Sequence, residues 1–481
     1  MVAVIRLHRC GKGLSKGRRM TKKVHMVSLG CPKNRVDSEV MVAKIQNDQS
    51  FEMVEDAAEA DMVVVNTCGF IDAAKEESVD TILEMVERKK RGQLSKVVVT
   101  GCLSQRYSGD LEVEIPEVDA ILGTKTFTAI NDALHGKLEQ KSYIQPGSFI
   151  MDHEVERTNT VRGGTAYLKI AEGCSRSCSF CIIPKIRGKQ KSRTIDDVVA
   201  EAKRLGRAGV KEIILVAQDM TSYGIDLDPR TNRDYLVRLL RRLEEEATEI
   251  EWVRLLYMYP WNFTDELIEL FQHGERLVPY VDMPLQHVNR RILKSMRRNI
   301  QRKAQKELIA RLRSIDDLVL RTSLIAGYPG ETDEEFQELY DWVEEVEFDR
   351  VGVFVYSPEE GTPAAKMEDQ VEEQVKLERR NALMELQRKI SEEKNQQWVG
   401  YTTEVLVDGV SEEHEFVLEG RHYGQAPEID GVVYLSFDYG GEMPTPGDLV
   451  EVEIQQATAY DLTGAVIPED PLGVADGEIG I

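Results

Sequence analysis

The sequence predicts an α/β protein in three parts: an N-terminal doubly wound parallel sheet, a central partial (β/α)6 TIM-like barrel, and a small antiparallel OB-like β-barrel. Strands alternate with helices over the first 140 residues, and the alternation resumes with six strand candidates in the middle of the chain. Short alternating segments rich in Val, Thr, Tyr and Gly follow. The chain has 481 residues. At roughly 100–200 residues a domain, that length allows about two to four domains.

The N-terminal part, which we place at residues 24–140, alternates short β-branched runs with helical stretches. We expect strands at Val24–Leu29, Asp61–Val65 and Lys96–Val99, and helices at Asp37–Asn47 and Ile71–Lys89. A repeat of about 35 residues is typical of a parallel sheet with helices on both faces. The polar, turn-rich stretch that follows, up to residue 164, is predicted to be a connector.

The second part, residues 160–395, contains six strand candidates with amphipathic helices after or between them. The strand candidates are Ala166–Ile170, Glu212–Val216, Trp252–Tyr257, Tyr280–Met283, Val319–Ile325 and Val351–Tyr356. Six βα units are enough for a partial barrel, whose reaction site should lie at the C-terminal ends of the strands. A long charged helix, Val371–Gln397, is predicted to act as a strut or linker.

The two ends of the chain differ in character. Residues 398–467 alternate β-branched and polar residues between Gly-containing turns, which is typical of a small barrel of OB type. Residues 1–19 form a basic leader with six Lys or Arg and no acid. We expect Met20 to be the natural start and the leader to be disordered or not native.

The charge of the chain is acidic and unevenly placed. Acids outnumber bases 84 to 61, and the net charge of −23 argues against a general binder of nucleic acid or of membrane surfaces. Residues 399–481 hold 18 acids and one base, Arg421, which is a net charge of −17. We find no signal peptide, no apolar run near the ~20 residues that span a bilayer, and too few cysteines for a disulfide scaffold. These features predict a cytoplasmic protein with reduced thiols.

Three cysteines, Cys174, Cys178 and Cys181, stand within eight residues after the first strand of the predicted barrel. A 4Fe–4S cluster normally takes four thiolates, so three leave one iron open to a small chelating molecule. Zinc would need a fourth protein ligand, and no His stands nearby in the sequence. The C-x₃-C-x₂-C spacing is that of radical S-adenosylmethionine enzymes, and we predict such a cluster on this loop.

A second set of cysteines, Cys31, Cys68 and Cys102, is spread over the N-terminal part at separations of 37 and 34 residues. Each follows an apolar strand, and the C-terminal strand ends of an open parallel sheet line one crevice. A single such cysteine is more often a small core residue, but three at equivalent positions predict a second 4Fe–4S cluster. Each has a neighbouring glycine that allows close backbone approach to a bulky ligand: Gly30, Gly69 and Gly101.

Other segments at predicted strand ends carry weaker signals. The basic run Lys185–Arg193 is either a solvated face or a contact for a polar substrate or the adenosyl carboxylate. Gln218 and Asp219 end the second barrel strand and should point into the site. Gly327–Glu331 either forms a tight turn or shapes the adenosyl pocket, and His287 is more often structural than functional as a lone His.

These segments together resemble the methylthiotransferases of the radical S-adenosylmethionine superfamily, over about residues 24–467. Within the family, the chain is most similar to the enzymes that act on ribosomal protein S-twelve of the small subunit. The tRNA-modifying relatives usually read Pro-Leu-Gln-Ser where this chain has His287. The basic leader departs from the family pattern. The matching segments are Ser28–Asn34, Asn66–Ile71, Gly101–Gln105, Glu172–Pro184, Pro284–His287 and Tyr356–Thr362.

The resemblance implies a fold and a reaction. The central part would be a barrel of radical S-adenosylmethionine type, and the C-terminal part the small barrel known as TRAM. The reaction replaces a hydrogen on the β-carbon of one aspartate with a methylthio group. That C–H bond is too weakly acidic for a side-chain base, so a radical must abstract the hydrogen.

The resemblance also implies cofactors and partners. Two 4Fe–4S clusters would be held by the two sets of cysteines, and two S-adenosylmethionine molecules would be used per turnover. One would methylate a sulfur held on the second cluster, and the other would yield the 5′-deoxyadenosyl radical. By the family pattern, Phe180 lies against the adenine, and Gln218 and Asp219 lie near the adenosyl group. A flavodoxin or ferredoxin would donate electrons.

Two alternatives remain open at this point. The first is the same chemistry on adenosine in tRNA, but a module that grips RNA should present Lys and Arg beside aromatic residues. The acidic C-terminal region should repel phosphates and attract a basic ribosomal protein. The second alternative is an iron–sulfur electron carrier without catalysis, which would not need an open iron at the mouth of a barrel.

Overall fold

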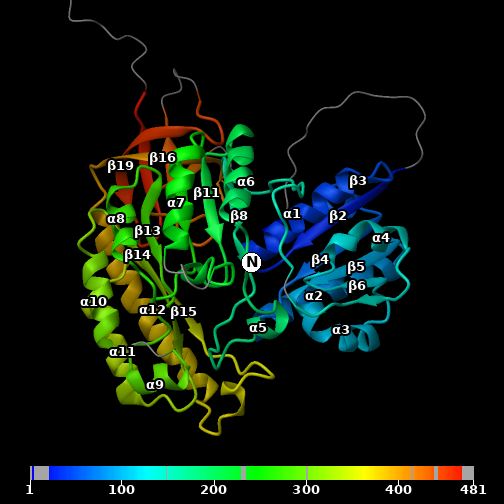
Figure 1. Ribbon diagram of the computed structural model, residues 1–481, viewed down its shortest axis with the longest axis horizontal. Helices are drawn as coiled ribbons and strands as arrows, with labels where there is room; N and C mark the ends of the chain where they lie inside the picture. The colour runs from blue at the N-terminus through cyan, green and yellow to red at the C-terminus, as the bar shows by residue number, and fades with distance from the viewer. Residues whose placement is uncertain are drawn as a thin grey trace, which may run out of the picture.

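The computed structural model describes residues 3–4, 21–147, 149–228, 234–298, 302–411, 413–414, 417–437 and 443–468. Figure 1 shows the N-terminal α/β part, in blue and cyan, at the side of the central α/β part. The C-terminal β-barrel, in red, covers one end of the central part. The three predicted architectures are confirmed.

The N-terminal sheet is parallel except at one edge. Its strand order is β1-β2-β4-β5-β6-β7, with β3 also paired to β2, and only β1 runs antiparallel among the described strands. The strands are β1 (Ala3–Val4), β2 (Lys22–Ser28), β3 (Phe51–Met53), β4 (Met62–Thr67), β5 (Lys96–Gly101), β6 (Ala120–Leu122) and β7 (Ser142–Tyr143). The helices are α1 (Pro32–Gln46), η1 (Ala57–Glu59), α2 (Asp72–Lys90), α3 (Cys102–Glu114), η2 (Phe127–Ala129) and α4 (Ile130–His135).

The sheet is doubly wound because alternate residues of its strands face two different helical layers. On β4, Val63 and Val65 pack with Ile82 of α2, whereas Val64 packs with Val40 of α1. Helix α1 begins at Pro32, five residues before the predicted start at residue 37, because the extended Cys31 leads into a proline at the first helical position.

Helix α1 is buried on all sides, since it lies between the N-terminal sheet and the first strand of the central part. Of the basic leader, the structure describes only β1, which pairs with β2. The remaining leader residues lie outside the described part.

The central part is an open parallel sheet of six strands in the order β8-β11-β12-β13-β14-β15. The strands are β8 (Thr165–Lys169), β11 (Glu212–Val216), β12 (Trp252–Leu255), β13 (Leu277–Asp282), β14 (Val319–Ala326) and β15 (Arg350–Val355). The other elements are β9 (Ala171–Glu172), α5 (Ile183–Ile186), β10 (Lys191–Ser192), α6 (Ile195–Arg207), η3 (Met220–Ser222), α7 (Tyr235–Glu246), α8 (Asp265–His273), α9 (Arg290–Ser295), α10 (Arg302–Leu312), α11 (Asp333–Val346), η4 (Ala364–Lys366) and α12 (Glu373–Gln396).

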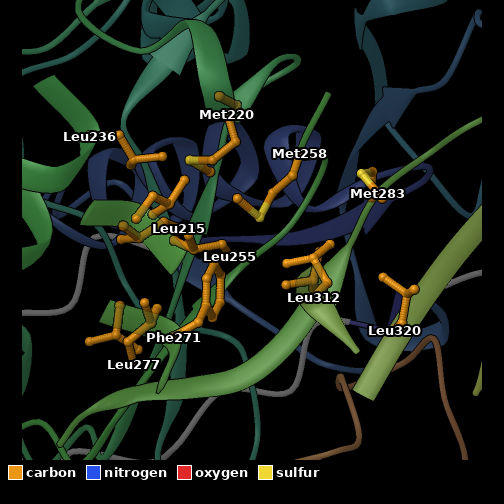
Figure 2. Close-up of a cluster of buried hydrophobic side chains, with 14 of the residues drawn as sticks. Leu215, Met220, Leu236, Leu255, Met258, Phe271, Leu277, Met283, Leu312 and Leu320 are labelled. Carbon is orange, nitrogen blue, oxygen red and sulfur yellow. The ribbon is translucent and has the colours of Figure 1, made fainter. Parts of the chain in front are cut away.

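The outer faces of these strands pack against the helices in the largest hydrophobic cluster (Figure 2), in which Leu215 and Leu255 meet Leu236 and Phe271. The inner faces are covered by the other two parts of the chain. Inner residues such as Ile214 share a second cluster with α1 and the C-terminal barrel. Because this cluster is continuous, the N-terminal and C-terminal parts close the partial barrel.

The C-terminal part is a closed five-stranded barrel in the order β16-β17-β18-β20-β19. Its strands are β16 (Thr402–Val410), β17 (Leu418–His422), β18 (Val433–Ser436), β19 (Leu449–Ala457) and β20 (Leu462–Val466). The pair β18–β20 is parallel, so the barrel is not antiparallel throughout as predicted. Strand β20 closes the barrel by pairing with β18 on one side and with β19 on the other, as in a barrel of OB type.

Helix α12, the predicted strut, packs on β14, β15 and α11 and also contacts β19 of the barrel. Within the described residues, no helix combines the length and the apolar character needed to cross a bilayer.

Candidate functional site

The three loop cysteines, Cys174, Cys178 and Cys181, lie between β9 and α5, past the C-terminal end of β8. Gly173 allows the loop to fold back on the chain that follows it. Its φ is +77°, and an added Cβ would lie 2.4 Å from the Lys189 carbonyl oxygen. The Cys174 N–H donates to the Gly188 carbonyl at 3.0 Å. The loop is therefore closed by its own flanks, at the end of the barrel where the sequence predicts chemistry.

Neighbouring strand ends hold the loop in place. The Ser179 hydroxyl is 2.8 Å from the Tyr328 hydroxyl and donates to the Ser295 carbonyl at 2.8 Å. Tyr328 belongs to the Gly327–Glu331 turn after β14, so this turn supports the cysteine loop directly. Phe180 packs on the same apolar cluster as Tyr328.

Asp219 and Gln218, predicted near the adenosyl group, both contact the region of the loop. Buried Asp219 accepts a 2.6 Å bond from Arg176 Nε, and Arg176 lies between two loop cysteines in sequence. Arg176 also stacks over the ring of Tyr259, 4.1 Å from its centroid. Gln218 donates to Glu172 at 3.1 Å, and its amide oxygen is buried without a partner. That oxygen is free to accept a hydrogen bond from a ligand.

The loop thiols lie close enough to influence one another electrostatically. Burial raises the pKa of the Cys174 thiol to about 11 and that of the Cys181 thiol to about 12. The negative charge of Cys178 adds to both increases. Buried, mutually repelling thiolates need a cation, and a bound iron cluster would supply it.

The three strand-end cysteines, Cys31, Cys68 and Cys102, follow β2, β4 and β5 at one edge of the N-terminal sheet. We expected their glycines to admit a ligand, but in the structure they let the three strand ends approach one another. A Cβ added to Gly30 would lie 2.9 Å from Cys68 Cβ, and one added to Gly101 would lie 2.5 Å from the Thr67 carbonyl oxygen. The cysteines predicted to converge are therefore held at touching strand ends.

The strand-end cysteines differ from one another in their electrostatic environment. Burial alone would raise the pKa of Cys31, but Lys33, Arg187 and two backbone N–H groups outweigh it and lower the pKa. Burial raises the pKa of Cys68 to about 12, with Cys102 and Cys31 adding to the increase. Burial likewise raises the pKa of Cys102. One thiol of the set is thus prepared to ionise before the others.

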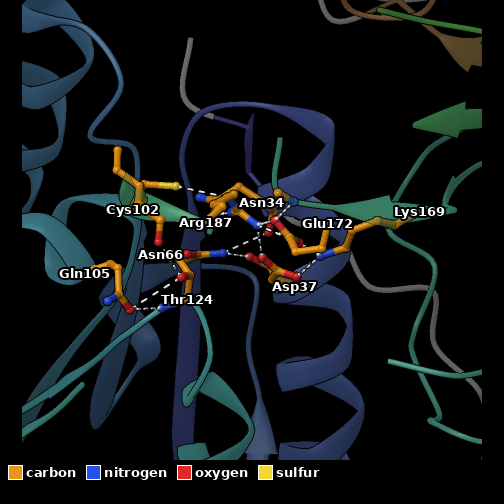
Figure 3. Close-up of polar contacts among 12 residues, drawn as sticks. Asn34, Asp37, Asn66, Cys102, Gln105, Thr124, Lys169, Glu172 and Arg187 are labelled. Atoms are coloured by element: carbon orange, nitrogen blue, oxygen red, sulfur yellow. Dashed lines mark hydrogen bonds and ion pairs between the residues drawn. The ribbon is translucent and has the colours of Figure 1, made fainter. Parts of the chain in front are cut away.

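A buried ionic network beside Cys102 joins the N-terminal part to the central part (Figure 3). Arg187, one turn of helix after the loop cysteines, donates from Nε to Cys102 Sγ at 3.4 Å. Its Nη1 binds Asp37 at 3.1 Å and Glu172 at 3.0 Å, and its Nη2 donates to Asn34 Oδ1 at 3.0 Å. Lys169 pairs with the same two carboxylates, at 2.9 Å for Glu172. The basic run is therefore not a solvated face at Arg187, which is a buried bridge between the two parts.

Glu359 forms a second connection across the same boundary. This buried carboxylate belongs to the segment after β15 and receives Arg106 of α3 at 2.6 Å and Lys75 of α2 at 3.0 Å. Sequence reasoning treated the segment only as a family match. No signal in the sequence pairs Glu359 with residues some 250 positions earlier.

His287 is structural in its contacts, as a lone histidine was expected to be. It is fully buried, and its Nδ1 accepts a bond from the Asn289 N–H at 2.9 Å. Its Nε2 lies 3.4 Å from Glu331, a carboxylate that Arg379 holds at 2.8 Å.

The described thiols do not form a site for a single metal ion. In the described ranges, no three His, Cys, Asp or Glu side chains converge closely enough to ligate one metal ion. That argues against a closed zinc site in this part of the chain. A cubane spreads its ligands over several irons, and a 4Fe–4S cluster held by three thiols would keep one iron without a protein ligand.

Comparison with known proteins agrees with this site. Three family models match the chain: the uncharacterized protein family UPF0004 at residues 23–123, the radical SAM superfamily at 168–343 and the TRAM domain at 399–467. A protein of Sorangium cellulosum named ribosomal protein uS12 methylthiotransferase RimO is 48% identical over 461 residues, which is 95% of this chain and 93% of that protein. The protein of the same name from Geobacter sulfurreducens is 46% identical, covering 93% of this chain and 99% of that protein.

The chain belongs to the RimO family. Membership of the radical SAM superfamily implies that a RimO-family chain uses a 4Fe–4S cluster and S-adenosylmethionine.

Solved structures agree with this assignment at the level of the fold. The radical S-adenosylmethionine methyltransferase TsrM from Kitasatospora setae, with cobalamin and a 4Fe–4S cluster bound, has a TM-score of 0.53 and 16% sequence identity. The match covers 72% of this RimO-family chain and 77% of TsrM.

Proposed function

We propose that this protein is a radical S-adenosylmethionine methylthiotransferase that acts on ribosomal protein uS12. In the reaction, the β-carbon of one aspartate loses a hydrogen and gains a CH₃S group. The observation that carries the proposal is the placement of three cysteines on the loop past β8 and of three more at the ends of β2, β4 and β5, in two parts of the chain that the buried side chain of Arg187 joins. A simple electron carrier has no need of two clusters that each keep one iron open.

In this proposal, the chain's own residues bind the clusters, orient groups at the site and exclude water from it. When bound, two 4Fe–4S clusters and two S-adenosylmethionine molecules supply an electron, the 5′-deoxyadenosyl radical and a site for the sulfur. The loop cysteines hold one cluster and the strand-end cysteines hold the other. Arg176 orients Asp219, and Gln218 offers its free amide oxygen. Phe180 would lie against the adenine. The contacts of Glu359 keep the N-terminal part closed over the barrel mouth and so exclude water.

The surface of the C-terminal barrel favours a basic protein over RNA as the substrate. Its single base, Arg421, is buried between Glu212 at 2.7 Å and Asp408 at 2.8 Å, so it offers no charge to a phosphate. Glu404 and Glu451 are exposed and stand opposite one another on β16 and β19. Like charges in that position destabilise a sheet, and a cationic partner would relieve the repulsion. Such a partner would be met in the cytoplasm, with a flavodoxin or ferredoxin as the electron donor.

The test is an anaerobic assay of the reconstituted enzyme with dithionite and S-adenosylmethionine, offered uS12 and tRNA side by side. We expect 5′-deoxyadenosine to form, and uS12 to gain the mass of CH₃S less one hydrogen, by mass spectrometry. Absence of 5′-deoxyadenosine would overturn the enzyme assignment. The same mass gain on tRNA would replace the proposed substrate by the runner-up.

A further inference from the structure

Buried cations in this protein almost always pair with a carboxylate. Among the described residues, ten Lys and Arg are classed as buried, and eight of them form ion pairs with Asp or Glu. The paired cations are Arg35, Lys169, Arg187, Arg193, Arg254, Lys376, Arg379 and Arg421. Pairing is expected, because an uncompensated charge is costly to bury.

The two exceptions, Lys33 and Arg298, form no ion pair with a described carboxylate, and both lie over tyrosines of one loop. The Lys33 ammonium is 3.4 Å from the centroid of the Tyr257 ring, and the Arg298 guanidinium is 4.2 Å from that of Tyr259. The charge of Arg298 lowers the pKa of the loop cysteine Cys181, and the charge of Lys33 lowers the pKa of the strand-end cysteine Cys31. Each set of cysteines thus has one unpaired buried cation near it.

Lys33 is buried with its ammonium against the ring of Tyr257. It is 6% exposed and sits in the first turn of α1, two residues after Cys31. Tyr257, beneath it, has a left-handed φ of +62°, which is a strained value for a residue with a side chain. Its N–H donates to Asp282 at 2.9 Å, and its carbonyl accepts from the Met220 N–H at 3.1 Å. These two bonds fix the backbone of Tyr257 beside Met220, the residue that follows Asp219, and the Lys33 ammonium lies over the ring of this tyrosine.

We propose that Lys33 binds the side-chain carboxylate of the substrate aspartate. The inference rests on the proposed function and deepens it. The carboxyl carbon of aspartate is bonded directly to the β-carbon, so a cation that grips the carboxylate fixes the reacting carbon within one bond. The ring of Tyr257 gives the ammonium a partial partner while the site is empty, and a carboxylate adds a charge-assisted hydrogen bond.

The other cations at the boundary between the N-terminal part and the barrel already form ion pairs with carboxylates. Arg187 and Lys169 share Asp37 and Glu172, and Lys75 and Arg106 share Glu359. Of the cations that join the N-terminal part to the barrel, Lys33 is the one without a described carboxylate. Adenosine in tRNA carries no carboxylate, so a lysine in this role would favour the aspartate of a protein over that alternative substrate.

The test compares Lys33→Met with the wild-type holoenzyme by anaerobic calorimetry. The probes are a uS12 peptide that contains the modified aspartate and the same peptide with Asn in its place. We expect wild type to bind the Asp peptide about tenfold to a hundredfold more tightly than the Asn peptide. Lys33→Met should bind both peptides equally, and Lys33→Arg should keep part of the preference. Arg298→Met, the matched control, should keep the full Asp preference.

Two further readouts separate other sources of a carboxylate or charge effect. S-adenosylmethionine affinity and the reduction potential of the loop cluster should be unchanged in Lys33→Met. Weaker S-adenosylmethionine binding with an intact Asp preference would assign the carboxylate to the cofactor and overturn the inference. A shifted potential with an intact preference would assign Lys33 to cluster charge and also overturn it. If wild type modifies neither uS12 nor its peptide, the proposed function itself fails.

Discussion

The two cysteine sets are assembled by opposite routes. The loop cysteines lie within eight residues, and the flanks of one loop hold them. The strand-end cysteines are separated by 37 and 34 residues and meet only because β2, β4 and β5 are parallel neighbours. A local motif therefore builds one site, and sheet topology builds the other.

The two sets also differ in electrostatic surroundings. Burial raises the pKa of Cys174 and Cys181 in the loop. Among the strand-end cysteines, burial opposes ionisation of Cys31 too, but the charges of Lys33 and Arg187 outweigh it and lower its pKa. A site assembled from several elements can collect cations from each of them, whereas a short loop has fewer neighbours.

The largest effects should come from removing each set in turn. Cys174→Ala/Cys178→Ala/Cys181→Ala should abolish 5′-deoxyadenosine formation, because no cluster remains to supply the electron. Cys31→Ala/Cys68→Ala/Cys102→Ala should keep this cleavage and lose methylthio transfer. Each triple variant should lose about half of the iron and sulfide of the wild type. Equal loss of cleavage in both variants would contradict separate roles for the sets.

The next largest effect should come from replacing Arg187, which joins the N-terminal part to the central part. Arg187→Met leaves Asp37 and Glu172 with Lys169 alone, and breaking a buried ionic network in this way costs about 3–5 kcal/mol of stability. Urea unfolding of the anaerobically purified protein measures the loss. Lys191→Met, an exposed change in the same basic run, should stay within about 0.5 kcal/mol of wild type. Equal stability of Arg187→Met and Lys191→Met would show that the bridge is unimportant.

Glycine substitutions test whether both sets depend on close backbone approach. Gly101→Ala puts a Cβ 2.5 Å from the Thr67 carbonyl oxygen, and Gly173→Ala puts one 2.4 Å from that of Lys189, both at positive φ. Each should cost about 2–5 kcal/mol, from left-handed strain plus overpacking. Gly92→Ala, at φ +75° with nothing within 4 Å of the added Cβ, should cost only about 1–2 kcal/mol. Urea unfolding of the anaerobically purified proteins measures all three losses of stability. If all three variants lost a similar amount of stability, left-handed backbone strain alone would account for the loss, and close backbone approach would not contribute.

Acid pH should weaken the ion pairs between the N-terminal part and the central part more than it weakens the loop that carries Cys174, Cys178 and Cys181. Burial would raise the pKa of Glu201, but Arg157 and Arg193 outweigh it and lower the pKa, and Arg157 also binds Glu39 of α1. A carboxylate with a lowered folded pKa stabilises above its unfolded value of 4.5 and loses this contribution as the pH falls.

Unfolding free energy should therefore drop between about pH 5 and pH 3 in the wild type. It should drop less steeply in Glu201→Gln, as measured by urea titrations at each pH. If the unfolding free energies of the two proteins changed equally with pH, Glu201 would not contribute to the loss of stability in acid.

Sequence reasoning anticipated the architecture well. Glu212–Val216 was predicted residue for residue, and the other five central strands were found within a few residues of their ends. Short strands such as β6 and β7 were missed because two or three residues carry no periodicity. Trp252–Tyr257 was predicted too long, because the strand ends at Leu255 and Tyr257 turns into the left-handed region.

The sequence by itself predicted where the thiols lie, because cysteine spacing and strand periodicity are local properties of the chain. It identified two sets of thiols, an acidic C-terminal barrel and the strand ends at which reactions occur. Only the tertiary structure decided which charges meet. The bond of Arg187 to Cys102 spans 85 positions, and the contacts of Glu359 with the N-terminal helices span more than 250. Such pairs depend on how separate domains pack, and no local pattern records them.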